Sequence, residues 1–319
     1  MNLRDIYLKA IDTGISNDPR GRDAVIKELG LKEKEFQDLK QKDKELFDQE
    51  SLKNPYSDSR ILHGTGEEEI SNILVGIDIE VGEMLLAESL ERRGSKMDLV
   101  IAHHPEGTAY ANLSSVMYMQ ADILNRYGVP INIAEDLMDG RAKEVERRLM
   151  PINHTRAVDA ARLLNMPFLC LHTPADNMVA TFLQRLFDEQ KPHSLGDISD
   201  LLLSIPEYSE SAKNGAGPKI MQGSKTRRAG RVFVDMTGGT EGSKDIFNSL
   251  ANSGVNTIVG MHISEEHRKE AEKNHVNVVI AGHISSDNLG MNLLLDNVFS
   301  GASVNILECS GFRRINRTA

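Results

Sequence analysis

The chain has 319 residues, which suggests about two domains at roughly 150 residues each. Acidic residues outnumber basic ones by 47 to 37. This balance argues against nucleic acid or an anionic membrane as a general partner. The two cysteines, Cys170 and Cys309, are far apart, which argues against a disulfide scaffold and a cysteine-ligated metal site. Because no apolar run approaches about 18 residues and no signal segment is evident, we expect a cytoplasmic protein.

Residues 1–69 are polar and rich in Lys and Glu. Apolar residues recur there at helical spacing, for example at Leu3, Ile6, Tyr7 and Ala10. We therefore predict a helical extension that packs on the main body or on a partner chain. Nothing in this segment points to chemistry.

Residues 70–190 are predicted to form a first α/β lobe. Short apolar runs at 73–77, 99–102 and 168–171 are typical of buried parallel strands, and helical patterns separate them. The first two runs and the helix between them form a βαβ unit within about 30 residues.

Residues 191–230 turn polar and rich in Gly, Pro, Ser and Lys, which predicts a linker. Residues 231–319 then repeat the earlier order, with a strand at 232–235, a helix and a strand at 255–261. We predict a second α/β lobe similar to the first. A last helix and a closing strand near 304–307 are expected to complete this lobe.

Half of the ten histidines follow these predicted strands directly. Ligands of open α/β sheets bind at the carboxyl ends of the strands, so this placement indicates a site. A carboxylate follows two of the histidines at the fourth position, where a strand turns into a helix. The five histidines are His103, His104, His172, His262 and His283.

Imidazole and carboxylate together suit zinc, manganese, iron or nickel. Three of these five histidines, together with the two aspartates that follow them, would be too many ligands for one closed tetrahedral zinc. They would suit two ions about 3.5–4 Å apart. Open positions on such ions would hold water or substrate, as in catalytic sites. The net positive charge would hold a bridging hydroxide and attract an anionic substrate.

Three motifs resemble the signatures of the NIF-three-like dinuclear metal-binding family, whose members are often described as GTP cyclohydrolase type 2 homologues. The motifs are Ile-Ala-His-His-Pro at 101–105, His-Thr-Pro-Ala-Asp at 172–176 and Gly-His-Ile-Ser-Ser-Asp at 282–287. The resemblance covers about residues 70–312. It implies two similar α/β lobes with two metal ions in the cleft between them, and a homo-oligomer, commonly a toroidal hexamer. The ligands that it implies are His103, His104, Asp176, His283 and Asp287.

The chain departs from the family pattern in three places. The family usually has Glu where this chain has Asp287, so the helix that carries this shorter side chain must sit closer or a water must intervene. The segment 191–230 is too short for the extra domain that some relatives insert between the lobes. The segment 1–69 lies outside the resemblance.

Three further residues are candidates for catalysis, and two of them have a plainer alternative. Glu106 follows the histidine pair and is a candidate general base, or a solvated loop residue. His172 is a candidate for orienting a ligand or contacting substrate, or for simple packing. His262 is a candidate substrate contact or general acid.

The sequence thus predicts a dinuclear metal-dependent hydrolase. A metal-activated hydroxide would attack a phosphate ester or a purine-type ring carbon of a nucleotide, as in a GTP cyclohydrolase. The alternative is a non-catalytic metal-binding or regulatory protein that acts as an oligomer. A nucleotide-binding regulator is a third hypothesis, which would depend on the turn at 238–239.

Overall fold

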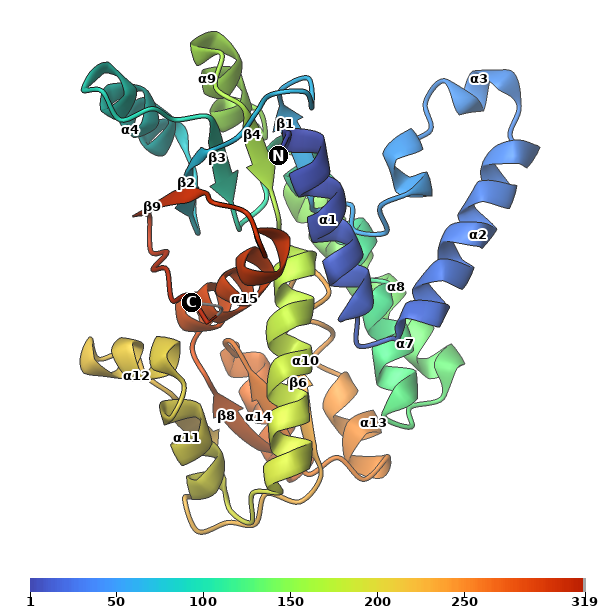
Figure 1. The fold of residues 1–319 in the computed structure, drawn as a ribbon. Coiled ribbons are helices and arrows are strands. Elements are labelled where there is room, and N and C mark those ends of the chain that lie inside the picture. The colour runs from blue at the N-terminus through green and yellow to red at the C-terminus, as the bar shows by residue number, and fades with distance from the viewer. Residues whose placement is uncertain (318–319) are drawn as a thin grey trace.

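The computed structural model describes residues 1–317, which form two β-sheets with helices around and between them (Figure 1). The first sheet has the strand order β1 (Arg60–His63), β4 (Phe168–Cys170), β3 (Leu99–Ala102), β2 (Asn72–Gly76) and β9 (Asn305–Cys309). The second sheet has the order β5 (Lys219–Gln222), β8 (Asn277–Ile280), β7 (Thr257–Gly260) and β6 (Val232–Asp235).

The two sheets repeat one arrangement. The strands β2, β3 and β4 run parallel, as do β6, β7 and β8. Each sheet also has an antiparallel strand at one edge, which is β1 beside β4 in the first sheet and β5 beside β8 in the second. Both edge strands shift register at the corresponding place, between Ile61 and His63 and between Ile220 and Gln222. The prediction of two similar α/β halves is therefore confirmed.

Two long helices lie side by side between the sheets, as Figure 1 shows. The helix α10 (Thr173–Gln190) leaves β4 and reaches β6, while α15 (His283–Val298) leaves β8. At their contact, Gly290 lies so near Ala175 that an added Cβ would be 2.4 Å from the carbonyl oxygen of Ala175. Glycine therefore allows the close approach of the helices that carry the two later motifs.

Further helices surround the two sheets and the two central helices. In the first half, α4 (Val81–Arg92) packs against α9 (Arg156–Leu164). The other helices after β1 are α5 (Gly107–Ala111), α6 (Leu113–Val116), α7 (Met119–Arg126), α8 (Ile131–Leu149), α11 (Leu195–Leu203), α12 (Pro206–Lys213), α13 (Ile246–Asn252) and α14 (Glu265–Lys273). Among residues 1–317, no helix combines the length and the apolar character that crossing a membrane requires.

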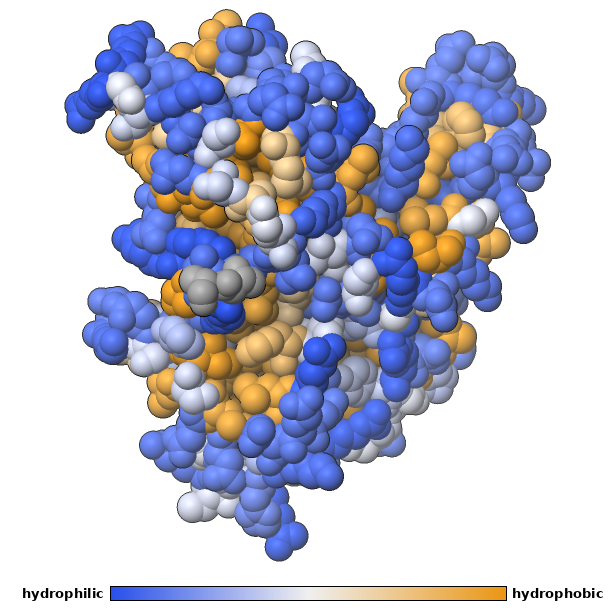
Figure 2. Space-filling view, in the orientation of Figure 1, coloured by the Kyte–Doolittle hydropathy of each residue, from blue (hydrophilic) through white to orange (hydrophobic). Residues whose placement is uncertain are grey.

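The N-terminal helices divide into a packed part and a projecting arm. The helix α1 (Leu3–Ser16) buries Leu3, Ile6, Tyr7 and Ala10 and packs on α10 and α15. The arm contains α2 (Arg22–Asp38), α3 (Gln41–Lys44) and the 3-10 helix η1 (Gln49–Leu52), and it stands away from the body on the face that Figure 2 shows.

Three segments differ from the expectation. The end of the segment predicted as purely helical, residues 1–69, contributes β1 to the first sheet. The segment 191–230, predicted as a linker, folds as α11, α12 and β5, and α11 buries Leu195, Ile198 and Leu202 in the core. The last strand, β9, pairs in parallel with β2 of the first sheet and not with the second sheet. Its sequence pattern does not encode which sheet it joins.

Candidate metal centre

The three motifs meet where the strands end. His103 and His104 directly follow β3, and His172 lies between β4 and α10. Pro174 lies in the first turn of α10, where its missing N–H costs no hydrogen bond, so the helix can begin directly after His172. In the second half, Gly282 adopts a φ of 116°, which side-chain-bearing residues rarely adopt, and thereby turns the chain from β8 into α15 at His283.

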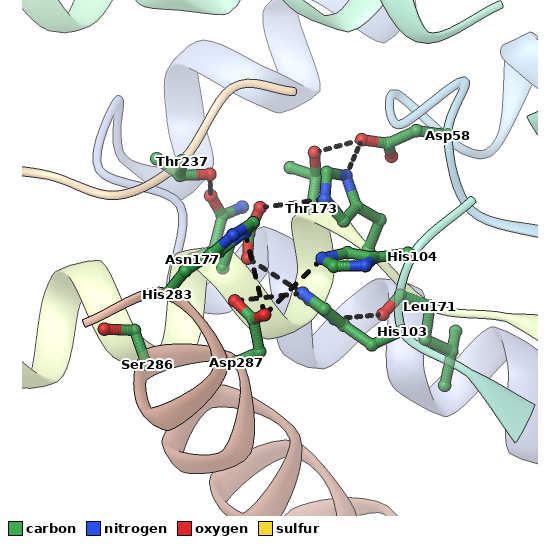
Figure 3. Close-up of polar contacts among 12 residues, drawn as sticks. Asp58, His103, His104, Leu171, Thr173, Asn177, Thr237, His283, Ser286 and Asp287 are labelled. Atoms are coloured by element: carbon green, nitrogen blue, oxygen red, sulfur yellow. Dashed lines mark hydrogen bonds and ion pairs between the residues drawn. The ribbon is translucent and has the colours of Figure 1, made fainter. Parts of the chain in front are cut away.

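Imidazole nitrogens and carboxylate oxygens face one another at this point (Figure 3). The Nε2 atom of His103 is 3.5 Å from an oxygen of Asp176 and 3.5 Å from an oxygen of Asp287. The other Asp287 oxygen is 3.4 Å from His104 Nε2 and 3.7 Å from His283 Nε2. All five residues that the resemblance implies as ligands are therefore brought together.

His172 joins the same cluster, because its Nε2 atom is 3.7 Å from Asp176 Oδ2. The donor atoms of two groups of three residues lie within 4.8 Å of one another inside each group. One group is His103, His172 and Asp176, and the other is His103, His104 and Asp287. His283 lies outside both groups, and its side chain is 41% exposed. Because His103 offers only one nitrogen, a pair of ions would need further donors such as His283.

The geometry fits metal ligation better than direct hydrogen bonding. Within residues 1–317, His103 Nε2 and both Asp287 oxygens are buried without a hydrogen bond. Buried polar atoms normally have such a partner. Two donors of one tetrahedral ion, each about 2.1 Å from it, lie about 3.4 Å apart, close to the separations seen here.

Acceptors on the outer side orient three of the imidazoles. The Nδ1 atom of His103 donates to the carbonyl of Leu171 at 3.2 Å, and that of His104 donates to Asp78 at 2.7 Å. His172 Nδ1 donates to Asp58 at 2.8 Å. Because these partners can only accept, each Nδ1 carries a proton and each Nε2 atom is directed toward the cluster.

The ionisable groups of the cluster influence one another's pKa. Burial, with Asp287 adding to its effect, raises the pKa of Asp176 well above its usual range. Burial alone would lower the pKa of His104, but Asp287 and Asp78 raise it to about 9. Burial lowers the pKa of His283 to about 4. A cation in the cluster would favour the ionised form of Asp176, which is the form that binds a metal.

A cavity of about 470 Å³ opens beside the cluster and contains the three candidate catalytic residues, Glu106, His172 and His262. Burial, with the charge of Glu80 adding to it, raises the pKa of Glu106 to about 7. His262 is exposed, and its ring centroid is 5.1 Å from that of His283. The structure therefore places all three at the cavity that the proposed ligands border.

Sequence reasoning missed Asp58, because it lies in the segment expected to be merely helical. Asp58 is fully buried and also accepts a hydrogen bond from Thr173 Oγ1 at 2.6 Å. Burial raises the pKa of the Asp58 carboxyl, but the hydrogen bonds from His172 and Thr173 more than offset this, so the pKa is lowered overall. Asp78, in contrast, could have been found from the sequence, because it directly follows the apolar run of the first predicted strand.

Asp235 should make the stability of the metal-free protein depend on pH. Burial, with the charge of Glu241 adding to it, raises the pKa of this cavity residue to about 6. Since the pKa of Asp235 is higher in the folded than in the unfolded state, its protonated carboxyl contributes to the free energy of unfolding. This contribution is complete below about pH 4 and is lost as the pH rises through 6. We expect Asp235→Asn to raise the free energy of unfolding by about 1–3 kcal/mol at pH 8 and to change it little at pH 4. Urea denaturation at both pH values measures this, and an effect independent of pH would contradict it.

Comparison with solved structures places this fold among known proteins. A NIF3 superfamily protein from Sphaerobacter thermophilus is 27% identical, with a TM-score of 0.69 over 80% of this chain and 91% of that chain. Reduced HcgD from Methanocaldococcus jannaschii is 12% identical, with a TM-score of 0.49 over 78% and 87%. The hypothetical protein SA1388 from Staphylococcus aureus is 13% identical, with a TM-score of 0.44 over 79% and 89%. No protein-family model matches the sequence, and no curated protein matches it.

The chain is thus a two-sheet α/β protein with groups of histidine and aspartate that could bind a metal at the ends of its strands. It is a NIF3-like protein, as its fold and its likeness to the Sphaerobacter protein show. The resemblance inferred from the three motifs is confirmed.

Proposed function

We propose that the chain is a hydrolase that depends on two divalent metal ions and acts on a phosphate ester or a nucleotide. The observation that carries this proposal is the set of buried donor atoms without hydrogen bonds, His103 Nε2 and both oxygens of Asp287, among the residues the structure describes. Zinc, manganese, iron and nickel suit this donor chemistry. The proposed ligands are His103, His104, Asp176, His283 and Asp287, with His172 as a sixth donor.

The residues around the proposed ligands are suited to proton transfer. When bound, the ions would supply Lewis acidity and lower the pKa of a coordinated water. Glu106, with a pKa of about 7, can take up a proton at neutral pH and return it, as a general base and acid must. We assign His262 the role of a substrate contact or general acid, because it lines the cavity beside His283.

The cavity itself is acidic, which bears on how an anionic substrate would bind. Among the described side chains that line it, Arg156 is the one with a permanent positive charge, against several carboxylates besides the proposed ligands. Those carboxylates are Asp78, Glu80, Glu106, Asp235 and Glu241. A phosphate or nucleotide would therefore depend on the ions for its attraction to this cavity. Ring opening of the GTP cyclohydrolase type is the specific reaction that the family resemblance suggests.

Metal analysis combined with an activity panel tests the proposal. We expect the reconstituted protein to hold two ions per chain and to hydrolyse GTP or a generic phosphoester only when loaded. His104→Ala should lower metal affinity and turnover by at least about 10- to 100-fold. His193→Ala, which changes an exposed histidine away from the cavity, should leave both unchanged.

Two outcomes would contradict parts of this proposal. Full metal occupancy without turnover of any substrate would overturn the hydrolase and leave a non-catalytic metal-binding protein as the alternative. Failure to bind metal after reconstitution would overturn the site itself. We further propose that the chain forms a homo-oligomer, and light scattering would measure its mass. The cytoplasmic location stays a prediction.

A further inference from the structure

The two halves of the proposed centre are built alike but held differently. In the α10 half, which we define as His172 and Asp176, the histidine follows β4 and the aspartate lies four positions later. In the α15 half, defined as His283 and Asp287, the histidine follows β8 with the same spacing. The repeat of the two sheets makes these halves counterparts.

The α10 half is fixed by the segment just before β1. Asp58 accepts from His172 Nδ1, and Ser59 Oγ accepts from the backbone N–H of His172 at 2.9 Å. Asp58 and Ser59 are fully buried, and the His172 side chain is only 8% exposed. The ring of His172 is therefore held by a charge-assisted hydrogen bond away from solvent.

The α15 half lacks this support. Within residues 1–317, no atom forms a hydrogen bond with Nδ1 of His283, whose side chain is 41% exposed. Asp58 lies two residues before β1, and the residue two before β5 is Gly217. A Cβ added to Gly217 would lie 2.5 Å from the Cβ of Ala212, so a carboxylate cannot occupy the corresponding position.

We propose that Asp58 is a positioning residue that makes the metal centre unequal, so that the α10 half binds its ion tightly and the α15 half binds its ion weakly. Carboxylates that hold a ligating histidine typically change metal affinity by about 10- to 100-fold. The inference rests on the proposed dinuclear centre, and it assigns a function to a segment outside the family resemblance.

Stepwise metal removal from the full chain tests the inequality directly. Protein loaded with zinc or manganese is dialysed against a weak chelator, and retained metal is measured by elemental analysis. We expect about one ion per chain to remain in the wild type. His283→Ala, at an exposed side chain, should remove only the ion that is lost first. Simultaneous release of both ions from the wild type would overturn the inequality alone, whereas no binding at all would overturn the proposed function as well.

The role of Asp58 has its own variants and calorimetric readout. Asp58→Asn should weaken the tighter binding step by about 10- to 100-fold, and it should add nothing further when His172→Ala is already present. Ser51→Ala is the matched control, because Ser51 is also a buried serine but its Oγ donates to the backbone carbonyl of Asp48 and not to Asp58. An unchanged tight step in Asp58→Asn, or an equal loss in Ser51→Ala, would overturn the role. If Asp58→Asn does not fold, Thr173→Val, which removes one donor to Asp58, should still weaken the same step.

Discussion

Asp287→Asn is expected to have the largest effect on metal binding of any single substitution in this chain. Each oxygen of Asp287 faces imidazole nitrogens, and its side chain is fully buried. An amide supplies one neutral oxygen in place of the two oxygens of a carboxylate, so it would attract a cation much less. We expect at least one ion to be lost and metal-dependent turnover to fall to background.

Thermal stability gives a readout of this substitution that is independent of activity. An ion at 100 times its dissociation constant stabilises the folded protein by about 2.7 kcal/mol, since it binds only that state. The rise in melting temperature on adding metal should therefore shrink in Asp287→Asn. Asp136→Asn, which removes one charge from the exposed surface of α8, is the control. An undiminished metal-dependent rise would remove Asp287 from the proposed ligands.

Gly290→Ala is expected to have the largest effect on stability. The new Cβ would be 2.4 Å from the carbonyl oxygen of Ala175, and backbone cannot move aside as a flexible side chain can. Overpacking of this kind typically costs about 1–3 kcal/mol, more than the gain of about 1 kcal/mol that alanine brings to a helix. Because Ala175 precedes Asp176, separation of α10 and α15 should also weaken metal binding.

A second helical glycine provides the control. Gly140 lies in α8 with no atom within 4 Å of the position of an added Cβ. Gly140→Ala should therefore raise the free energy of unfolding by up to about 1 kcal/mol and leave metal affinity unchanged. Urea denaturation and calorimetry measure both quantities. A stabilised Gly290→Ala protein would show that the helices can separate without cost.

Local sequence patterns predicted the parts of the site that depend on strand ends. The apolar runs before His103, His172 and His283 marked buried strands, and the carboxyl ends of parallel strands share one edge of a sheet. The spacing of Asp176 and Asp287 after a histidine also followed from the turn of a strand into a helix. These features are encoded within about ten residues of the chain.

Features that depend on distant pairing could not be predicted in this way. The contact between Asp58 and His172 joins residues that are 114 positions apart, and the segment around Asp58 has no strong periodicity. The pairing of β9 with β2 spans most of the chain, and the short apolar run of β9 suits either sheet equally. The segment 191–230 is mostly polar, which is typical of a linker, although its short apolar stretch lies in α11 and packs into the core.

The return of β9 to the first sheet means that the second sheet is an insertion within the first half. The chain enters this insertion through α10 and leaves it through α15, so two covalent connections join the halves side by side. A single linker would let the halves swing apart about one hinge. With two packed helical connections, the spacing between the two sets of donor atoms is fixed by the chain path itself.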